Sequence, residues 1–246
     1  MNENKDCIVL QNICKRYGQK QVLQDVSITV PYGAIYGLLG PSGCGKTTTV
    51  KIVAAISEAT SGNAFVLGEK MPQLQLMNKI GYMAQSDALY GDLTAKENLQ
   101  FFGALYGLKG QELDNRIIEV LELVNLSKDI HKRIEEFSGG MKRRLSLAMT
   151  LLHKPKVLIL DEPTVGIDPL LRKNIWEELY KLTEEGITIL VTTHVMDEAE
   201  KCTQLSMMRE GYLIATGTPR QIQENVGASS LEEAFLFYGR EILSES

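Results

Sequence analysis

The alternation of apolar and polar residues predicts that the chain folds into short strands separated by helices. Residues 8–13 and 22–30 alternate with a period of two, which is typical of strands in a half-exposed sheet. Residues 204–208 and 212–215 flank Arg209-Glu210-Gly211 in the manner of a β-hairpin. Continuous apolar runs predict buried strands at 34–39, 64–68, 80–84, 157–162 and 187–193.

Between residue 94 and about residue 123 the spacing of apolar residues becomes helical. Thr94 and Glu97 form a predicted capping box at the start of this segment. Two apolar stripes in this segment are interpreted as core. The first consists of Phe101, Leu105 and Leu108, and the second of Leu113, Ile117, Val120, Leu121 and Val124. The helix that carries the second stripe is predicted to be capped near Asp114. Further helices are predicted at 141–149, 171–185 and 230–238.

One loop carries a strong chemical signal. Gly40-Pro41-Ser42-Gly43-Cys44-Gly45-Lys46-Thr47 fits G-x-x-x-x-G-K-[ST] and lies between a predicted strand and a predicted helix that continues through Thr48. Glycines let backbone N–H groups converge on an anion, and the helix N-terminus adds a positive dipole end. Lys46 would reach the β- and γ-phosphates, and the Thr47 hydroxyl would ligate Mg²⁺. A glycine-rich turn with an incidental lysine is the alternative, but the context favours a nucleoside triphosphate site.

Weaker signals follow along the chain. Ser138-Gly139-Gly140 precedes a predicted helix and is either a second anion site or an ordinary cap. Asp161 and Glu162 end a predicted strand, where Asp161 would hold Mg²⁺ and Glu162 would face an attacking water; an acidic turn is the alternative. His194 could reach the same γ-phosphate, although a lone histidine is usually structural. Tyr17 either stacks on a purine or packs at a strand edge.

Composition narrows the range of functions. The chain has 246 residues, of which 44% are hydrophobic, and a net charge of −5 with basic residues scattered, which disfavours nucleic-acid binding. The four cysteines form no CxxC pair, which suits a reducing cytosol. Residues 1–6 lack the apolar run of a signal peptide, and no apolar stretch approaches the ~20 residues of a membrane helix. We therefore expect any membrane role to need another chain.

The order of these motifs over residues 17–194 resembles the ATP-binding cassette (ABC) ATPases. The resemblance implies an α/β fold: a P-loop NTPase core with an antiparallel β subdomain and an inserted α-helical subdomain at about 86–152. The nucleotide-binding domain would span residues 1–226, and a tail helix would follow at 227–246. It also implies ATP hydrolysis with Mg²⁺. It assigns the family's functional positions to this chain as follows: Tyr17 to adenine stacking, Gly40–Thr47 to Walker A, Gln85 to Mg²⁺ and the attacking water, Ser138, Gly139 and Gly140 to the signature, Asp161 and Glu162 to Walker B and the catalytic base, Asp168 to the D-loop, and His194 to the switch position.

Two departures from the family pattern are similar to its daunorubicin-type drug-exporter branch. The signature reads Phe-Ser-Gly-Gly-Met in place of Leu-Ser-Gly-Gly-Gln, and the D-loop reads Val-Gly-Ile-Asp in place of Ser-Ala-Leu-Asp. The basic run 142–144 and the tail 230–236 point the same way. The resemblance then implies a subunit, coupled to a membrane-spanning permease at the cytoplasmic face of the membrane, that exports its cargo. Two cassettes would meet head to tail, as a homodimer or a heterodimer.

The main alternative is a soluble ABC ATPase that acts on a ribosome or on DNA. Only 53 residues separate Gln85 from Ser138, no heptad repeat is sustained between them, and the chain carries one cassette, all of which disfavours that reading. A further hypothesis concerns Cys44, which lies at a helix N-terminus among converging N–H groups. We expect this field to favour the thiolate and to make Cys44 reactive toward maleimides.

Overall fold

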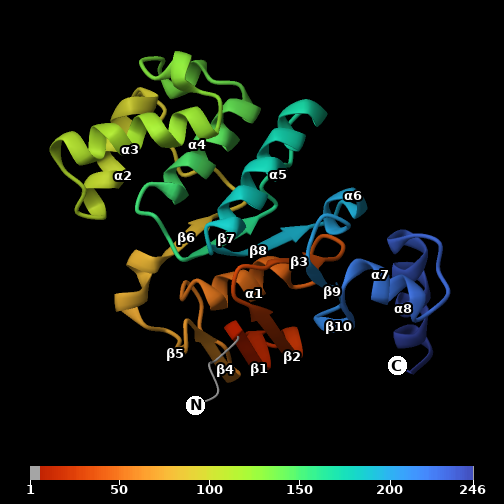
Figure 1. Cartoon of the computed structure of the whole chain (residues 1–246). Coiled ribbons are helices and arrows are strands. Elements are labelled where there is room, and N and C mark those ends of the chain that lie inside the picture. The colour runs from red at the N-terminus through yellow and green to blue at the C-terminus, as the bar shows by residue number, and fades with distance from the viewer. Residues whose placement is uncertain (1–5, 246) are drawn as a thin grey trace.

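The computed structural model describes residues 6–245, and its strands form two sheets (Figure 1). The smaller sheet is antiparallel, with the order β2-β1-β4-β5, and the larger has the order β10-β9-β3-β8-β7-β6. In the larger sheet β9, β3, β8, β7 and β6 run parallel, and β10 is antiparallel to β9. The strands of the smaller sheet are β1 (Asp6–Tyr17), β2 (Lys20–Pro31), β4 (Ser61–Val66) and β5 (Glu69–Lys70). Those of the larger sheet are β3 (Ile35–Leu39), β6 (Ile80–Met83), β7 (Val157–Asp161), β8 (Thr188–Thr193), β9 (Gln204–Arg209) and β10 (Tyr212–Gly217).

Helices cover both faces of the larger sheet. Helix α1 (Lys46–Val53) lies between the two sheets, and α5 (Pro169–Glu184) packs on the opposite face (Figure 1). The alternation along β3 divides the core accordingly, because Ile35 and Leu39 face one apolar cluster while Tyr36 and Leu38 face the other. The predicted α/β fold with an antiparallel sheet is confirmed.

Three helices form a separate group beyond β6 (Figure 1): α2 (Ala95–Leu105), α3 (Gly110–Leu123) and α4 (Gly139–Leu151). The capping box of Thr94 and Glu97 is present at the start of α2, as predicted. The second apolar stripe is buried, but α3 begins at Gly110 and Asp114 lies within it, so the predicted cap is wrong. Short 3-10 helices occupy Leu74–Lys79, Ser127–Asp129 and Ile134–Glu136.

Two residues of the first predicted stripe, Phe101 and Leu105, do not face the core. Helix α2 buries Ala95, Leu99 and Gly103, spaced by four residues, so this row is its core face. Phe101 and Leu105 lie on the other side and are 43% and 67% exposed. Leu108, beyond the helix, packs against the core as predicted.

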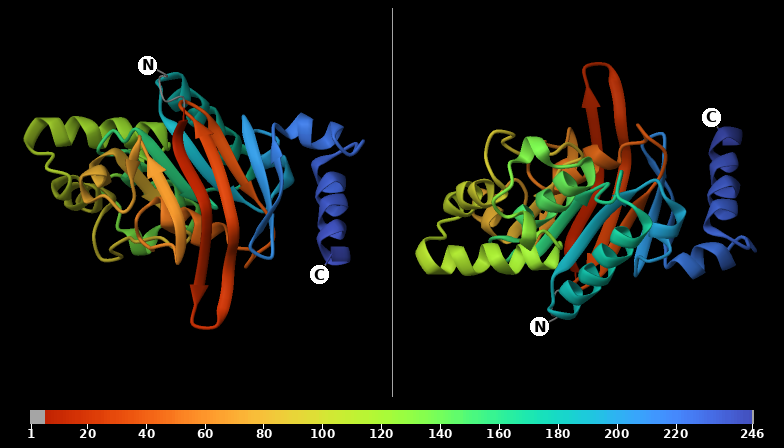
Figure 2. Two further views of the ribbon diagram at one scale, coloured as in Figure 1. Left: turned by 90° about the horizontal axis from the view of Figure 1, so that it is seen from below. Right: turned by 90° about the horizontal axis from the view of Figure 1, so that it is seen from above.

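The termini of the described segment show two further differences from expectation. Strand β1 continues through Tyr17, four residues beyond the strand predicted at 8–13, and the turn after it is confined to Gly18 and Gln19. After the predicted hairpin, a capping box at Thr218 and Gln221 begins a short helix, α7 (Pro219–Glu224), that the apolar pattern did not indicate. Helix α8 (Leu231–Glu245) lies alongside α7 and β10 at the edge of the molecule (Figure 2).

Candidate functional site

The carboxyl ends of β3, β7 and β8 bring the predicted catalytic residues to one edge of the larger sheet. In the parallel register Leu39 lies opposite Thr193, and Asp161 lies opposite Thr192. The phosphate loop leaves β3 at this edge, Glu162 follows β7, and His194 follows β8. Ligands bind outside the carboxyl ends of strands in open α/β sheets, so the topology places the candidate chemistry where such folds hold ligands.

The phosphate loop is tightly enclosed. Gly45 has a φ of +114°, and a Cβ there would lie 2.6 Å from Leu23 Cδ2. A Cβ on Gly40 would lie 2.3 Å from the Met208 carbonyl oxygen. The turn between β9 and β10 also closes against the loop, because Gly211 N donates to Cys44 O at 3.0 Å. Only glycine fits at positions 40 and 45, because a Cβ at either position would clash with the neighbouring atoms.

A cavity of about 170 Å³ lies in front of the loop. Lys46 is 4% exposed, and its Nζ donates to Gly40 O at 2.7 Å and to Pro41 O at 3.1 Å. The residues around the cavity are Val22, Ser42, Gly43, Gly45, Lys46, Thr47, Thr48, Gln85 and Glu162. The loop and the predicted Gln85 and Glu162 therefore share one site.

The carboxylate of Glu162 is the point where the four predicted catalytic side chains meet. Its Oε1 lies 3.6 Å from Lys46 Nζ and 3.3 Å from His194 Nδ1. Gln85 Nε2 donates to Oε2 at 3.3 Å. Glu162 is buried and its backbone has a φ of +51°, a conformation that costs about 1–3 kcal/mol for a residue other than glycine.

Asp161 lies beside this group and is fully buried. Its Oδ1 accepts hydrogen bonds from Thr47 Oγ1 at 3.2 Å and from Thr192 Oγ1 at 2.6 Å. Its Oδ2 is buried and has no hydrogen-bond partner among residues 6–240. A buried carboxylate oxygen beside a hydroxyl is a suitable ligand set for Mg²⁺, which prefers oxygen ligands, so these residues fit that ion.

Two buried polar residues of the site, Thr192 and Glu198, are not among those that the sequence predicts. Thr192 bonds Asp161 and also accepts a hydrogen bond from Glu162 N at 3.0 Å. Glu198 is buried and accepts from Thr193 Oγ1 at 2.7 Å and from Thr164 Oγ1, which ties the loop after Glu162 to the strand before His194. The available signal for Thr192 was the pair of threonines, 192 and 193, that follows the apolar run 189–191 at the end of the predicted strand; no signal marked Glu198.

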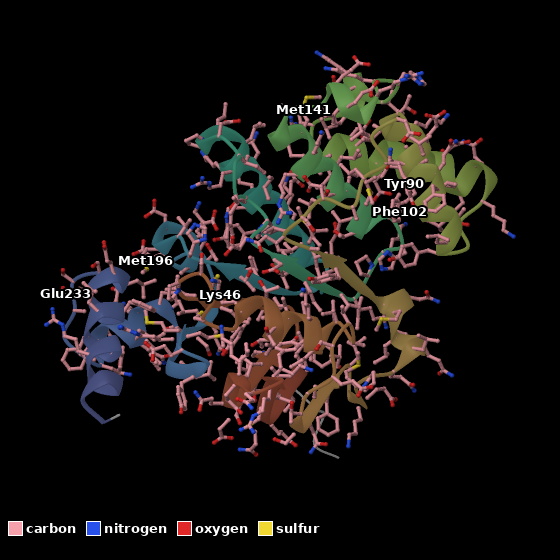
Figure 3. All side chains as sticks on the ribbon, turned by 180° about the vertical axis from the view of Figure 1, so that it is seen from behind. Lys46, Tyr90, Phe102, Met141, Met196 and Glu233 are labelled. Atoms are coloured by element: carbon pink, nitrogen blue, oxygen red, sulfur yellow. The ribbon has the colours of Figure 1, made fainter. Side chains whose placement is uncertain are left out.

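The predicted signature residues lie elsewhere. Ser138 caps α4, and its Oγ accepts from Met141 N at 3.2 Å. Figure 3 shows Met141 well apart from Lys46. Asp168 caps α5 by accepting from Leu170 N and Leu171 N. Within one chain, therefore, the N-terminus of α4 does not reach the cavity at the phosphate loop.

Tyr17 is half-exposed at the end of β1. The residue is 50% exposed, and Lys15 Nζ lies over its ring, 4.7 Å from the centroid. Its hydroxyl lies 3.4 Å from Ser57 Oγ. A ligand can therefore reach this side chain, and its role in adenine stacking stays a prediction.

The hypothesis of an activated Cys44 is wrong. The side chain is 4% exposed, and burial raises the pKa of its thiol above the ordinary value. The nearby Lys46 ammonium and the backbone N–H groups lower this pKa, but their effect is smaller than that of desolvation. Cys44 acts as a small apolar residue behind the loop.

A second cavity, of about 280 Å³, lies next to Gln85 between β6 and the helices α2 and α4. We call it the β6 groove. Phe102 in its wall packs with Tyr90 and Phe101, with ring centroids 5.1–6.1 Å apart. Figure 3 shows Tyr90 and Phe102 side by side. It is lined by Tyr82, Met83, Ala84, Ser86, Ala88, Phe102, Tyr106, Ser146, Met149 and Thr150.

Comparisons with known proteins agree with this geometry. The linearmycin resistance ATP-binding protein LnrL of Bacillus subtilis is 41% identical over 92% of this chain and 76% of its own length. The probable multidrug ABC transporter ATP-binding protein YbhF of Escherichia coli is 39% identical over 93% of this chain but only 41% of its own length. A Nod factor export ATP-binding protein I of Burkholderia lata is 41% identical over 92% of this chain and 75% of its own.

Solved structures show the same fold. An ATP-binding subunit of an ABC transporter has a TM-score of 0.86 and 27% identity, covering 95% of this chain and 99% of its own. The ATP-binding cassette MJ0796, a dimer in a post-hydrolysis state with ADP and phosphate, has a TM-score of 0.80 and 26% identity over 86% of this chain and 98% of its own. No helix among residues 6–245 is both long and apolar enough to cross a bilayer. The ABC transporter family model matches residues 23–165, and with these relatives it establishes that the chain belongs to the ABC transporter family, as an ATP-binding subunit that hydrolyses ATP.

Proposed function

We propose that Glu162 is the general base of ATP hydrolysis in this subunit. The observation that carries the proposal is the convergence of Lys46, Gln85 and His194 on the Glu162 carboxylate, within 3.6 Å. A carboxylate in this position can accept a proton from water that attacks the γ-phosphate. Lys46 would exchange its loop carbonyls for phosphate oxygens, and Gln85 and His194 would orient the water and the γ-phosphate.

Mg²⁺ would be held by Asp161 Oδ2, the Thr47 hydroxyl and Gln85. The unpartnered buried oxygen of Asp161 supports this assignment. When bound, the ion neutralises charge that develops on the β- and γ-phosphates. Thr192 would keep Asp161 in the required orientation by occupying its other oxygen. Tyr17 would stack on the adenine, which its exposed ring permits.

We further propose that two copies combine head to tail. Ser138, Gly139 and Gly140 stand at the N-terminus of α4, where the dipole and free N–H groups favour a phosphate. Met141, in the first turn of the same helix, lies well apart from Lys46 of the same chain (Figure 3), so a second cassette would have to bring its own α4 to the first cassette's ATP. Asp168, at the start of α5, would lie at the same interface. The dimeric cassette among the structural relatives supports this arrangement.

The permease would dock in the β6 groove at the cytoplasmic face of the membrane. The groove is lined largely by apolar and aromatic residues and adjoins Gln85, so a partner there could sense the nucleotide site. The names of the relatives concern linearmycin resistance, multidrug transport and Nod factor export, which favours export as the direction.

The test is Glu162→Gln in the full chain. We expect this variant to bind ATP, to lose at least about 100-fold in turnover, and to accumulate as a dimer in ATP during size-exclusion chromatography. Glu184→Gln, an exposed carboxylate late in α5, is the matched control and should behave as the wild type. Hydrolysis by Glu162→Gln close to the wild-type rate would remove Glu162 from the role of base.

A further inference from the structure

Arg143, in the second turn of α4, has its whole guanidinium enclosed by backbone carbonyls. It is 5% exposed. Its Nη1 donates to Ala84 O at 2.7 Å and to Gln85 O at 3.0 Å. Its Nη2 donates to Asp161 O and to Glu162 O, the latter at 2.7 Å, and its Nε donates to Pro163 O at 3.2 Å. A guanidinium has five N–H donors, so every donor of Arg143 is used.

The charge of Arg143 is balanced within the same cluster. Asp87 Oδ1 lies 3.6 Å from Nη1 and accepts a hydrogen bond from Ser146 Oγ at 2.8 Å. Burial lowers the pKa of Arg143, and the carboxylate of Asp87 opposes that shift. A buried cation with a nearby carboxylate and a full set of hydrogen bonds is a favourable arrangement, whereas a smaller donor set would leave carbonyls unpaired.

The five acceptors come from the two segments that carry the catalytic hydrogen bond. One segment, Ala84–Gln85, follows β6, and the other, 161–163, begins at the last residue of β7. The side chains of Gln85 and Glu162 meet across these segments at 3.3 Å. Arg143 therefore fixes the backbone on both sides of that contact from the helix that begins at Ser138.

The same guanidinium stabilises the unusual backbone of Glu162. With a φ of +51° this residue is in the left-handed region, which persists only when surrounding contacts hold it. Three successive carbonyls, those of Asp161, Glu162 and Pro163, turn toward Arg143. The Thr192 hydroxyl holds the Glu162 N–H from the opposite side.

We propose that Arg143 is a positioning residue for ATP hydrolysis, which holds the carboxylate of Glu162 against Gln85 and Lys46 through the backbone of both segments. This inference rests on the proposed role of Glu162. Lysine cannot replace Arg143, because an ammonium has three donors and no planar fork to reach five carbonyls. A displacement of about 1 Å at a catalytic group can cost about 100-fold in rate.

The experiment compares Arg143→Lys with Arg144→Lys in the full chain with its co-purified permease. Arg144 is the matched control, because it is also buried in α4 but donates only to Val124 O and Asn125 O, away from the catalytic segments. We expect Arg143→Lys to lower kcat by about 10- to 100-fold while the KM for MgATP changes less than about threefold. Arg144→Lys should leave kcat within about twofold.

A double-mutant cycle separates positioning from a general loss of structure. If Arg143 acts through Glu162, adding Arg143→Lys to Glu162→Gln should not lower the residual rate further. Should Arg143→Lys fail to fold, Asp87→Asn is the second variant: it keeps the size of Asp87 but removes its charge, and we expect kcat to fall with KM unchanged. The inference would be overturned if folded Arg143→Lys had the wild-type kcat, or if the double mutant lost the product of the two single-mutant factors in rate. It would also be overturned if Arg143→Lys failed to fold and Asp87→Asn kept the wild-type kcat. An active Glu162→Gln would instead overturn the proposed function.

Discussion

Replacing Thr192 by valine tests how the buried Asp161 is held. Valine has nearly the same shape as threonine, so the substitution removes a hydroxyl without opening a cavity. The Thr192 hydroxyl donates to Asp161 Oδ1 at 2.6 Å and accepts from Glu162 N at 3.0 Å. The two groups that lose this hydroxyl, the Asp161 carboxylate and the Glu162 N–H, are buried, so water cannot replace it.

The expected cost follows from these two contacts. A hydrogen bond to a charged group contributes about 1.5–3 kcal/mol, and a buried N–H left unpaired costs about 1–3 kcal/mol. Because the two share one hydroxyl and Thr47 still donates to Asp161 at 3.2 Å, we expect a combined loss of about 3 kcal/mol. For a domain of this size that corresponds to a fall in Tm of about 6–12 °C.

Thermal unfolding followed by circular dichroism measures this loss. Thr150→Val is the matched control, because the Thr150 hydroxyl is also buried but donates only to Leu147 O within its own helix. We expect the control to lower Tm by less than about 4 °C. If Thr192→Val unfolds at the same temperature as Thr150→Val, the Thr192 hydroxyl does not stabilise Asp161 as its geometry indicates.

Two further predictions concern the nucleotide and the thiol. Stacking on a base contributes about 1–3 kcal/mol and needs only the ring, so Tyr17→Ala should weaken ATP binding by about 5- to 150-fold in calorimetry while Tyr17→Phe binds normally. Equal affinities of the two variants would exclude the stack. Burial raises the pKa of Cys44, so the thiolate is scarce at pH 7 and becomes more abundant as pH rises. Mass spectrometry after brief maleimide treatment at pH 7 should therefore find label on the more exposed Cys14 first, and equal labelling of Cys44 would contradict its burial.

The meeting of Lys46 and Glu162 could be predicted from the sequence for a topological reason. Each follows a short apolar strand, and the carboxyl ends of neighbouring parallel strands share one edge of the sheet. Only the order of motifs was needed to expect that these residues serve one site. The fold class could be predicted on the same basis.

Other features depend on contacts that leave no pattern in the sequence. Arg143 stands in a basic run, and its partners are backbone carbonyls, which every residue type offers. The exposed row of α2 is as apolar as the buried row, so periodicity could not tell which side of Leu99 faces the core. For Cys44, the helix N-terminus was visible in the sequence, but the burial that outweighs it was not.

The enclosure of the phosphate loop has a consequence for the order in which the protein can be completed during synthesis. The loop is made by residue 47, yet its walls come from much later: Met208 lies against Gly40, and Gly211 closes on Cys44. Strand β9, which carries Met208, also pairs with β3 directly beneath the loop. A nascent chain therefore cannot form the finished ATP site until translation has passed the second hairpin strand, about 170 residues after the loop itself emerges. Until then ATP has no completed site with which to stabilise the growing chain.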